Sequence, residues 1–258
     1  MVGSPAEVDG GRVYIFSGST YALRRTLAAP SATEDAGFGF NLRADGDRGP
    51  VLAIASFGLP NTPFPQRGRV YVFSGSVTPD FVIENPEPAR FQLFGLEGLA
   101  LEIDRRGNPL LAVGEFSQGE VSHNQGQAFV YSGATQLYKE TSPDPAASNV
   151  FGISLTFADL RGFGWSLLVG APGDTVDGVA LSGRVYVFNA RGTLSESLTS
   201  PHPQANDAFG VPVIVSRGSC ETALVVGAPS TDLSGGRVEY FALRGNARDR
   251  ERCRSRGS

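Results

Sequence analysis

The chain contains few of the residues from which redox, metal and catalytic sites are usually built. Its 258 residues include two cysteines, two histidines, one tryptophan and one methionine. Neither His123 nor His202 has another histidine or a cysteine at metal-ligand spacing, so we expect both to be exposed loop residues. A Gly-x-Ser-x-Gly elbow, a phosphate-binding glycine loop with lysine and a His-Glu-x-x-His motif are also missing. We therefore predict that the chain is not an enzyme.

Long hydrophobic runs are missing as well. Apolar residues make up 41% of the sequence. Their runs end well short of the ~18 residues that a membrane-spanning helix requires. A secretory signal peptide is not visible at the start of the sequence. We predict no membrane span in this chain.

The charge is divided unevenly along the chain. The net charge is −4, but the segment 244–258 holds six arginines and contributes +4, which leaves −8 on residues 1–243. An acidic body lacks the basic surface that nucleic-acid binding requires, so we predict no nucleic-acid partner. The arginine-rich segment has few apolar residues, and we expect it to be a disordered tail beyond a folded domain of residues 1–243.

What the chain does contain is a repeat. A hexapeptide with a leading glycine and alternating apolar residues occurs five times, at 11–16, 68–73, 126–131, 183–188 and 236–241. The leading glycines are 57, 58, 57 and 53 residues apart. A Phe-Gly pair and a segment related to Val-Gly-Ala-Pro precede the hexapeptide in most repeats, always in this order. A fixed period of this length indicates a repeat architecture.

Each repeat is predicted to be a four-stranded antiparallel sheet. Within the hexapeptide at 68–73, Tyr71 and Phe73 point to one face of the strand and the valines point to the other, because strand side chains alternate. Both faces are apolar, so each sheet has to pack between two others. The sequence therefore predicts an all-β fold, a β-propeller. Its blades consist of strands A (Phe-Gly), B (Val-Gly-Ala-Pro), C (the hexapeptide) and D.

Three complete and two partial blades are expected from this period of about 57 residues. The complete blades open at Phe38, Phe94 and Phe151. The first partial blade lacks the Phe-Gly strand, and the last one, which opens at Phe209, has no convincing D strand. Since both partial blades carry a C strand, they cannot merge into one blade. We expect an open arc of blades, not a closed ring.

These motifs resemble the FG-GAP repeat of integrin α-subunit propellers and their bacterial relatives. Val169–Pro172 and Val226–Pro229 match the Val-Gly-Ala-Pro motif in full, whereas Ile54–Phe57 and Val113–Phe116 depart from it. The resemblance implies an extracellular or cell-surface propeller that mediates protein interaction or adhesion. Members of the family usually close with seven blades, so it also implies that the chain is a fragment of a longer protein.

In this family, acidic turns between strands A and B bind Ca²⁺, a cation that takes about six to eight oxygen ligands. Only one such turn here keeps two carboxylates in register, Asp45 and Asp47, and Arg48 follows them. A weak Ca²⁺ site and an ordinary Asp-Gly hairpin turn are the two alternatives. We favour the turn, because too few oxygens remain for the ion, and we expect no metal or other cofactor.

The two cysteines leave a further alternative open. Cys220 lies in the last A–B turn and Cys253 in the arginine-rich tail. A disulfide between them would hold the tail against the body, but two unpaired thiols are also compatible with the sequence. The extracellular setting that the resemblance implies favours the disulfide.

Three classes of function agree with these observations. The first is a non-enzymatic scaffold that binds a protein through the loops between strands B and C. These loops vary while the strands repeat, which is how a rigid scaffold presents a binding surface. The second is a glycan-binding, lectin-type propeller. The third is an accessory domain of a larger secreted enzyme, with the catalytic residues outside this chain.

We predict that any ligand contacts the face formed by the B–C loops. The loop 173–178 is the most polar of them, with two carboxylates, and we expect it to be flexible and solvated. Ordinary solvated turns are the alternative reading for every residue on this face. The polar contacts that we predict are His123, Asn124, Asp174, Asp177 and Asp232.

Overall fold

The structure is a computed structural model of the chain, described here for residues 1–31, 36–46, 50–58, 68–87, 93–104, 106–115, 125–144, 150–160, 164–217, 222–230 and 235–243. The described residues form β-strands and one short 3-10 helix, η1 (Val8–Gly10). Within these ranges no helix has the length and apolarity needed to cross a membrane. The fold is therefore all-β, as the sequence predicts.

The strands form five antiparallel sheets, which we call blades 1 to 5 in chain order. Blade 1 contains β1 (Val2–Ser4), β2 (Arg12–Phe16) and β3 (Leu23–Ala28). Blade 2 contains β4 (Leu42–Asp45), β5 (Val51–Ser56), β6 (Arg69–Phe73) and β7 (Phe81–Glu84). Blade 3 contains β8 (Leu99–Ile103), β9 (Pro109–Glu115), β10 (Gln127–Ser132) and β11 (Thr135–Thr141). Blade 4 contains β12 (Ser154–Leu160), β13 (Gly164–Ala171), β14 (Arg184–Asn189) and β15 (Leu194–Leu198). Blade 5 contains β16 (Val213–Arg217), β17 (Thr222–Ala228) and β18 (Arg237–Leu243).

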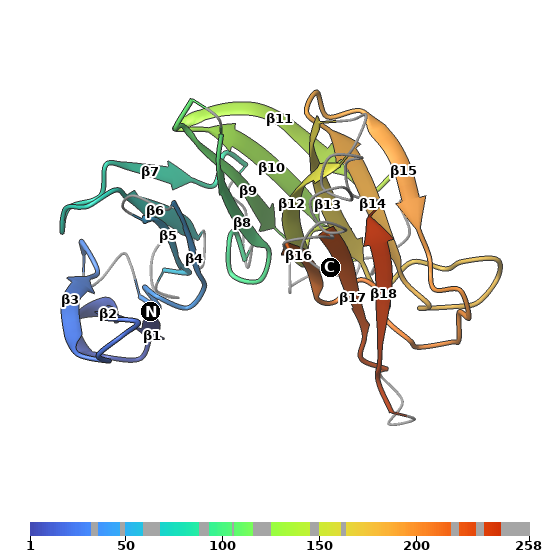
Figure 1. The fold of residues 1–258 in the computed structure, drawn as a ribbon, viewed down its shortest axis with the longest axis horizontal. Coiled ribbons are helices and arrows are strands. Elements are labelled where there is room, and N and C mark those ends of the chain that lie inside the picture. The colour runs from blue at the N-terminus through green and yellow to red at the C-terminus, as the bar shows by residue number, and fades with distance from the viewer. Residues whose placement is uncertain are drawn as a thin grey trace, which may run out of the picture.

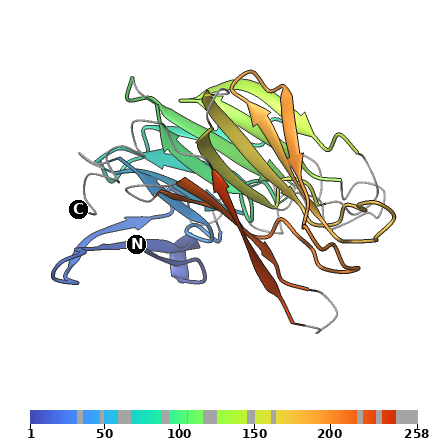
Figure 2. The same ribbon diagram turned by 45° about the vertical axis from the view of Figure 1, so that its right-hand side comes forward.

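The blade count agrees with the prediction. The described strands make three four-stranded and two three-stranded sheets, and neighbours in the chain are neighbours in each sheet. The two short sheets differ in what they lack. Blade 1 has strands B, C and D, whereas blade 5 has strands A, B and C. The five blades follow one another in an arc, with blades 1 and 5 as its two ends (Figures 1 and 2).

Hydrophobic side chains hold consecutive blades together. Four clusters of described residues each join two consecutive blades, and none of them joins blade 1 to blade 5. We call each of these interfaces between two consecutive blades a seam. All seams have the same design, because side chains alternate along the C strand and place aromatic residues on one face and smaller ones on the other. Between blades 1 and 2, for example, Tyr71 and Phe73 of blade 2 pack on Val13 and Leu27 of blade 1.

The Phe-Gly pair seals each seam. Phe38, Phe94, Phe151 and Phe209 are fully buried. The amide of Phe209 donates to the carbonyl of Ser182 in blade 4 at 3.0 Å. The chains approach so closely there that a Cβ built on Gly183 would lie 2.1 Å from the Phe209 carbonyl oxygen. Glycine is therefore required at this place of the repeat.

Part of the sequence lies outside the described residues. It includes the tail 244–258, Cys220 and Cys253. The domain boundary at residue 243, the disordered tail and both alternatives for the cysteines therefore stay predictions.

Candidate functional site

The candidate site is the face of the arc where the B–C loops lie together with the D–A segments that lead from one blade to the next. We call it the B–C face. Its longest described part is the loop 172–183 of blade 4, which contacts the segment 199–209. His123, Asn124 and Asp232 lie outside the described residues, so the structure places only Asp174 and Asp177 of the predicted contacts.

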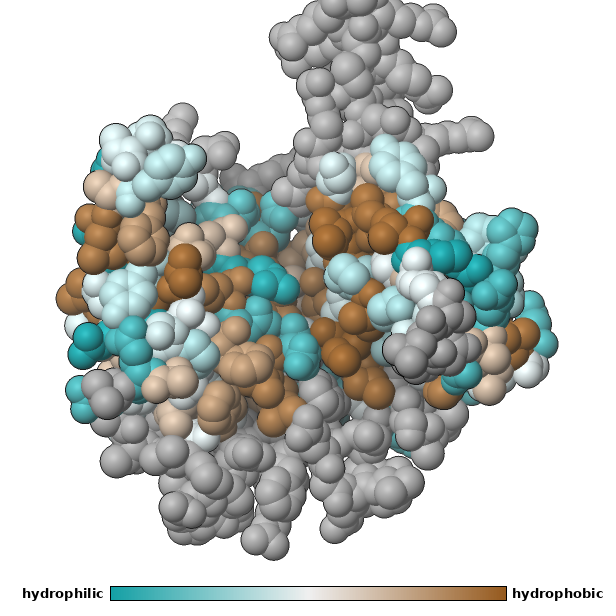
Figure 3. Space-filling model, turned by 90° about the horizontal axis from the view of Figure 1, so that it is seen from below, coloured by the Kyte–Doolittle hydropathy of each residue, from teal (hydrophilic) through white to brown (hydrophobic). Residues whose placement is uncertain are grey.

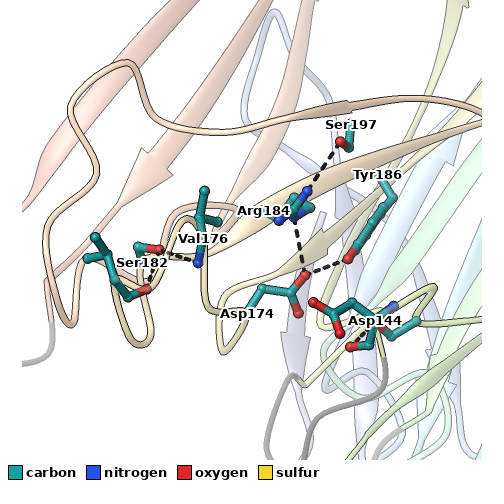
Figure 4. A network of polar contacts seen from close by, with 9 residues as sticks. Asp144, Asp174, Val176, Ser182, Arg184, Tyr186 and Ser197 are labelled. Carbon is teal, nitrogen blue, oxygen red and sulfur yellow. Dashed lines mark hydrogen bonds and ion pairs between the residues drawn. The ribbon is translucent and has the colours of Figure 1, made fainter.

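Asp174 is buried, in contrast to the solvated position that we expected. Its side chain has no exposed surface and its Oδ2 accepts a 2.6 Å hydrogen bond from the Tyr186 hydroxyl. The Arg184 Nε lies 3.6 Å from the same oxygen (Figure 4). The expectation of a flexible, solvated carboxylate is thus wrong for Asp174. Its contacts fasten the loop to strand C of its own blade, because Tyr186 and Arg184 both belong to β14.

Burial shapes the acid–base properties of this cluster. Desolvation raises the pKa of Tyr186 well above its ordinary value, and the hydrogen bond to Asp174 raises it further. The phenol therefore stays protonated and remains a donor to the carboxylate. Ser142, which follows the last strand of blade 3, also bonds to Tyr186, so the cluster crosses the seam between blades 3 and 4.

Asp177 has the opposite environment. It is exposed at the tip of a two-residue hairpin in which Val176 and Val179 exchange both backbone hydrogen bonds, at 3.1 and 2.9 Å. Asp177 and Gly178 have φ of +51° and +81°, the left-handed pair that an Asp-Gly turn supplies. Val176 is buried beneath the turn, and its amide donates to Ser182 Oγ at 3.2 Å. The loop is therefore an organised support for an exposed carboxylate.

The neighbouring segment extends this support. The amides of Asn206 and Ala208 donate to the carbonyls of Ala180 and Leu181 at 3.1 and 3.0 Å. The Ser230 amide, at the start of the next B–C loop, donates to the Asp207 carbonyl at 3.1 Å. Backbone hydrogen bonds thus connect the loops of blades 4 and 5 across the D–A segment into one platform.

A second polar cluster supports the platform between blades 4 and 5. Arg237 donates a short hydrogen bond to Asp207 and another, at 3.1 Å, to the carbonyl of His202. Ser200 Oγ donates to Glu239 Oε1 at 2.5 Å. Arg237 and Glu239 occupy the same positions in strand C as Arg184 and Tyr186 of blade 4. The seam cluster is therefore repeated along the arc.

The corresponding cluster between blades 2 and 3 is built around a buried acid, Glu115. The Gln127 amide donates to Glu115 Oε2 at 3.3 Å, and Lys139 binds Glu87 at 2.7 Å in the same region. Desolvation raises the pKa of Glu115 to about 7, although hydrogen bonds from Gln127 and Asn85 act in the opposite direction. The pKa of this carboxyl group is thereby brought close to neutral pH.

A separate cavity lies along the inner strands. It has a volume of about 140 Å³ and is lined by residues of the A strands β4, β8, β12 and β16, among them Arg43, Glu102 and Thr156. Arg43 is exposed where it lines this cavity, and it donates to Asn41 Oδ1 at 2.9 Å. Surrounding protein atoms lower its pKa by desolvation. The cavity is thus small and is lined by both polar and apolar side chains.

The acidic turns use their carboxylates for their own structure. Asp45 Oδ2 accepts a 2.7 Å hydrogen bond from the Ile103 amide of blade 3. Asp104 Oδ1 accepts two, from Arg106 and Asn108, both at 2.8 Å, which lowers its pKa. Within the described part of the chain, no group of three or more acidic, histidine or cysteine side chains could hold a metal. Asp47 lies outside that part, so the calcium alternative stays untested.

Sequence reasoning missed the buried seam residues Glu115 and Asp207 and the half-buried Arg237. Two signals could have found them. Glu115 stands at the alanine position of Val-Gly-Ala-Pro, where a carboxylate is unexpected. The second residue of the hexapeptide is arginine or glutamine in every repeat, which indicates a recurring polar partner. His202, predicted to be exposed, is exposed on the B–C face.

Comparison with solved structures confirms the class of protein that these observations define, a β-propeller. The structure of BBS1N in complex with ARL6DN matches with a TM-score of 0.51 and 14% identity, over 93% of this chain and 56% of that chain. An α-L-arabinanase of Penicillium chrysogenum, complexed with arabinobiose, matches with a TM-score of 0.54 and 10% identity, over 93% and 69%. The chain thus spans little more than half the length of the BBS1 domain. No family model and no curated protein sequence matches it.

These comparisons change two of the sequence-based conclusions. They support a propeller, but they do not confirm the finer assignment to the FG-GAP repeats of integrins. The prediction that the chain is not an enzyme is wrong, because it was inferred from missing catalytic motifs alone. The arabinanase is an enzyme on a fold that matches 93% of this chain, so missing catalytic motifs do not separate this chain from enzymes.

Proposed function

We propose that the chain is a binding scaffold that takes a protein ligand on the B–C face, at the platform of blades 4 and 5. One observation carries this proposal. Leu181 is an apolar side chain with 39% of its surface exposed, and it is held at φ +51°. A bulky residue in the left-handed region is strained, and such strain persists at sites where the exposed side chain has a use.

The polar residues near Leu181 indicate which kind of ligand would fit this face. Asp177 presents a carboxylate from the tip of the same loop, and His202 is exposed on the adjoining segment. An apolar contact beside an acidic one suits a protein surface that carries a hydrophobic side chain next to a basic one. Among the propellers that this chain is similar to, BBS1N was solved in complex with a protein, ARL6DN.

The setting that goes with this function is an extracellular or cell-surface one, as the resemblance to integrin propellers implies. The same resemblance supports adhesion as a role. Fractionation of cells that express the protein tests the proposed extracellular or cell-surface location.

A random peptide library displayed on phage tests the proposed face. Peptides selected on the wild-type chain should lose at least tenfold in affinity for Leu181→Asn and for Asp177→Asn. Asparagine tolerates a positive φ, so Leu181→Asn should also stabilise the fold slightly while it weakens binding. Leu137→Asn is the matched control, because Leu137 is exposed on the D strand β11 of blade 3. Peptides that bind all three variants as they bind the wild type would locate the ligand elsewhere.

A second candidate function is a glycan-acting propeller. The observation that favours it is the channel cavity with Arg43, Glu102 and Thr156 among its lining residues, polar groups that can bond to sugar hydroxyls. The arabinanase with arabinobiose is a propeller of this kind. Titration with arabinobiose, followed by assay of reducing sugar released from arabinan, tests this function. Arabinobiose binding that is weakened in Arg43→Ala would support this function. If the chain neither binds arabinobiose nor releases reducing sugar, the result would count against it.

A further inference from the structure

The A strands form the inner wall of the arc. β4, β8, β12 and β16 lie on the inner side of blades 2 to 5, and each contacts the next (Figure 1). Side chains at the start of one A strand bond to the backbone at the start of the next. Asn41 Nδ2 donates to the Glu97 carbonyl at 2.9 Å, and Ser154 Oγ accepts from the Val213 amide at 2.8 Å. These bonds hold the strands that line the cavity in fixed positions.

The register of the strands explains which side chains line this cavity. Arg43, Ala100 and Thr156 occupy equivalent positions, since each pairs with the residue that precedes the valine or isoleucine of the B-strand motif. Ala100 is smaller than its two counterparts, which leaves space on the inner wall between blades 2 and 4. Leu101 and Phe157 follow in their strands and supply apolar surface to the same cavity.

Arg43 is the cationic residue of the cavity, and its partners are neutral. Its Nη1 donates to Asn41 Oδ1 at 2.9 Å and to the Leu42 carbonyl at 2.8 Å. Arg184 and Arg237, by contrast, lie beside the carboxylates of the seams. Within the described part of the chain, no ion pair neutralises Arg43. A guanidinium has further N–H donors on Nε and Nη2, so Arg43 keeps donors for a ligand.

The environment of Arg43 favours a ligand of opposite charge. Burial by the surrounding strands lowers the pKa of Arg43, whereas a carboxylate close to it would raise that pKa. Glu102, which also lines the cavity, is therefore not the counter-ion of Arg43. A cation that is partly removed from water and has no counter-ion gains a strong, charge-assisted interaction when an anion binds.

The size and the walls of the cavity define the rest of the ligand. Its volume of about 140 Å³ holds more than a single water, but it is well below the roughly 300–1,000 Å³ of pockets for drug-sized ligands. The apolar side chains suit a short hydrocarbon, and Glu102 disfavours a second negative charge. On the outer surface too, hydrophobic and hydrophilic residues lie side by side when the molecule is seen from below (Figure 3). The arginine, and not mixed polarity alone, therefore distinguishes this cavity.

We propose that this cavity binds a small organic monocarboxylate. The carboxylate accepts hydrogen bonds from the remaining N–H groups of Arg43, and the hydrocarbon part packs against Leu101, Phe157 and Val215. Glu102 selects against dicarboxylates. The site is separate from the B–C platform, and it does not rest on the glycan-acting function, because its ligand is an anion and not a neutral sugar.

Isothermal titration calorimetry of the full chain with sodium butyrate tests the site, at constant ionic strength and neutral pH. Butyramide has nearly the shape of butyrate but no charge, and succinate adds a second carboxylate. We expect saturable binding of butyrate and at least tenfold weaker binding of butyramide and of succinate. This comparison uses only the wild-type chain, so it does not depend on how a variant folds. Absence of butyrate binding, or equal binding of butyrate and butyramide, would overturn the proposal. Chloride that displaces butyrate at equal concentration would overturn it in favour of a site for any small anion.

Two variants locate the binding. Arg43→Gln should weaken butyrate binding at least tenfold. Arg24→Gln is the matched control, because it removes the same charge from an exposed arginine of β3, in the outer strand of blade 1. Butyrate affinity that is unchanged in Arg43→Gln, or lowered equally in both variants, would overturn the proposal.

Arabinobiose separates this site from the glycan-acting function. Binding of butyrate without binding of arabinobiose would support the monocarboxylate site and count against the glycan function. Binding of arabinobiose without binding of butyrate would overturn the monocarboxylate site and leave the glycan function in place.

Discussion

The Tyr186 hydroxyl donates a 2.6 Å hydrogen bond to Asp174 Oδ2, and this bond joins the B–C loop of blade 4 to its C strand. The carboxylate is buried beneath a loop whose tip, at Asp177, is exposed. Two acids three residues apart therefore have different roles. One holds the loop in place, and the other faces the solvent where a ligand can meet it.

This difference gives the first prediction. Asp174→Ala should lower the free energy of unfolding by about 2–3 kcal/mol, because it leaves the buried Tyr186 hydroxyl without its acceptor and removes the carboxylate beside Arg184. Asp177→Asn should change it by less than about 0.5 kcal/mol, because the side chain is exposed and asparagine tolerates the φ of +51° at this turn. Urea denaturation of both variants measures the two values. Equal costs would show that the buried contact is not what organises the loop.

The second prediction concerns pH. Glu115 has a pKa of about 7 in the folded chain, above its ordinary value of 4.5, because burial disfavours the charged form. Between these two values the folded chain binds a proton that the unfolded chain does not, so stability falls as pH rises from about 4.5 to about 7. Below pH 4.5 Glu115 is protonated in both the folded and the unfolded chain. Above pH 7 it is ionised in both, and its contribution to stability has been lost completely.

The variant Glu115→Gln isolates this effect. Glutamine keeps the size and the acceptor oxygen but does not ionise, so the loss of stability at high pH, on the order of 3 kcal/mol at most, should disappear. Thermal unfolding at pH 5 and pH 8 compares the wild type with the variant. Glu140, whose pKa burial also raises to about 7, is the control, and Glu140→Gln should remove a separate part of the pH dependence. A wild type and a Glu115→Gln variant with the same pH dependence would contradict the prediction.

The fold could be predicted from the sequence further than the site could. The hexapeptide and the Phe-Gly pair fix strand, register and seam at once, because each residue has the same neighbour in every repeat. The D strand of blade 1 and the lack of one in the described part of blade 5 followed from the same pattern.

The site depends on contacts that no local pattern shows. Asp174 and Asp177 look alike in a polar loop, and only the position of Tyr186 beneath the loop makes one of them buried. Similarly, Glu115 gains its high pKa from the burial that the seam imposes. Charge and polarity identify candidate residues, but burial decides their role, and burial is a property of the packed blades.

The third prediction is that calcium does not stabilise this chain. Asp45 Oδ2 already accepts the Ile103 amide at 2.7 Å, and Asp104 closes its own turn with two backbone hydrogen bonds. Oxygens that are used in this way are not available to an ion that takes about six to eight ligands. We expect thermal unfolding in millimolar Ca²⁺ and in EDTA to agree within about one degree. A stabilisation of several degrees, with a calorimetric binding signal that Asp45→Asn removes, would contradict this.

The fourth prediction tests the glycine cradle of the seams. Gly183→Ala should destabilise the fold by more than about 2 kcal/mol, for two reasons that add. Its φ of +84° is unfavourable for a residue with a Cβ, which costs about 1–2 kcal/mol, and that Cβ would lie 2.1 Å from the Phe209 carbonyl oxygen. Gly18→Ala is the matched control, because Gly18 has no positive φ and nothing lies within 4 Å of its Cβ position. It should cost nothing or stabilise slightly. If urea denaturation finds the same change for both, the close approach of Phe-Gly to the preceding blade does not hold the arc together.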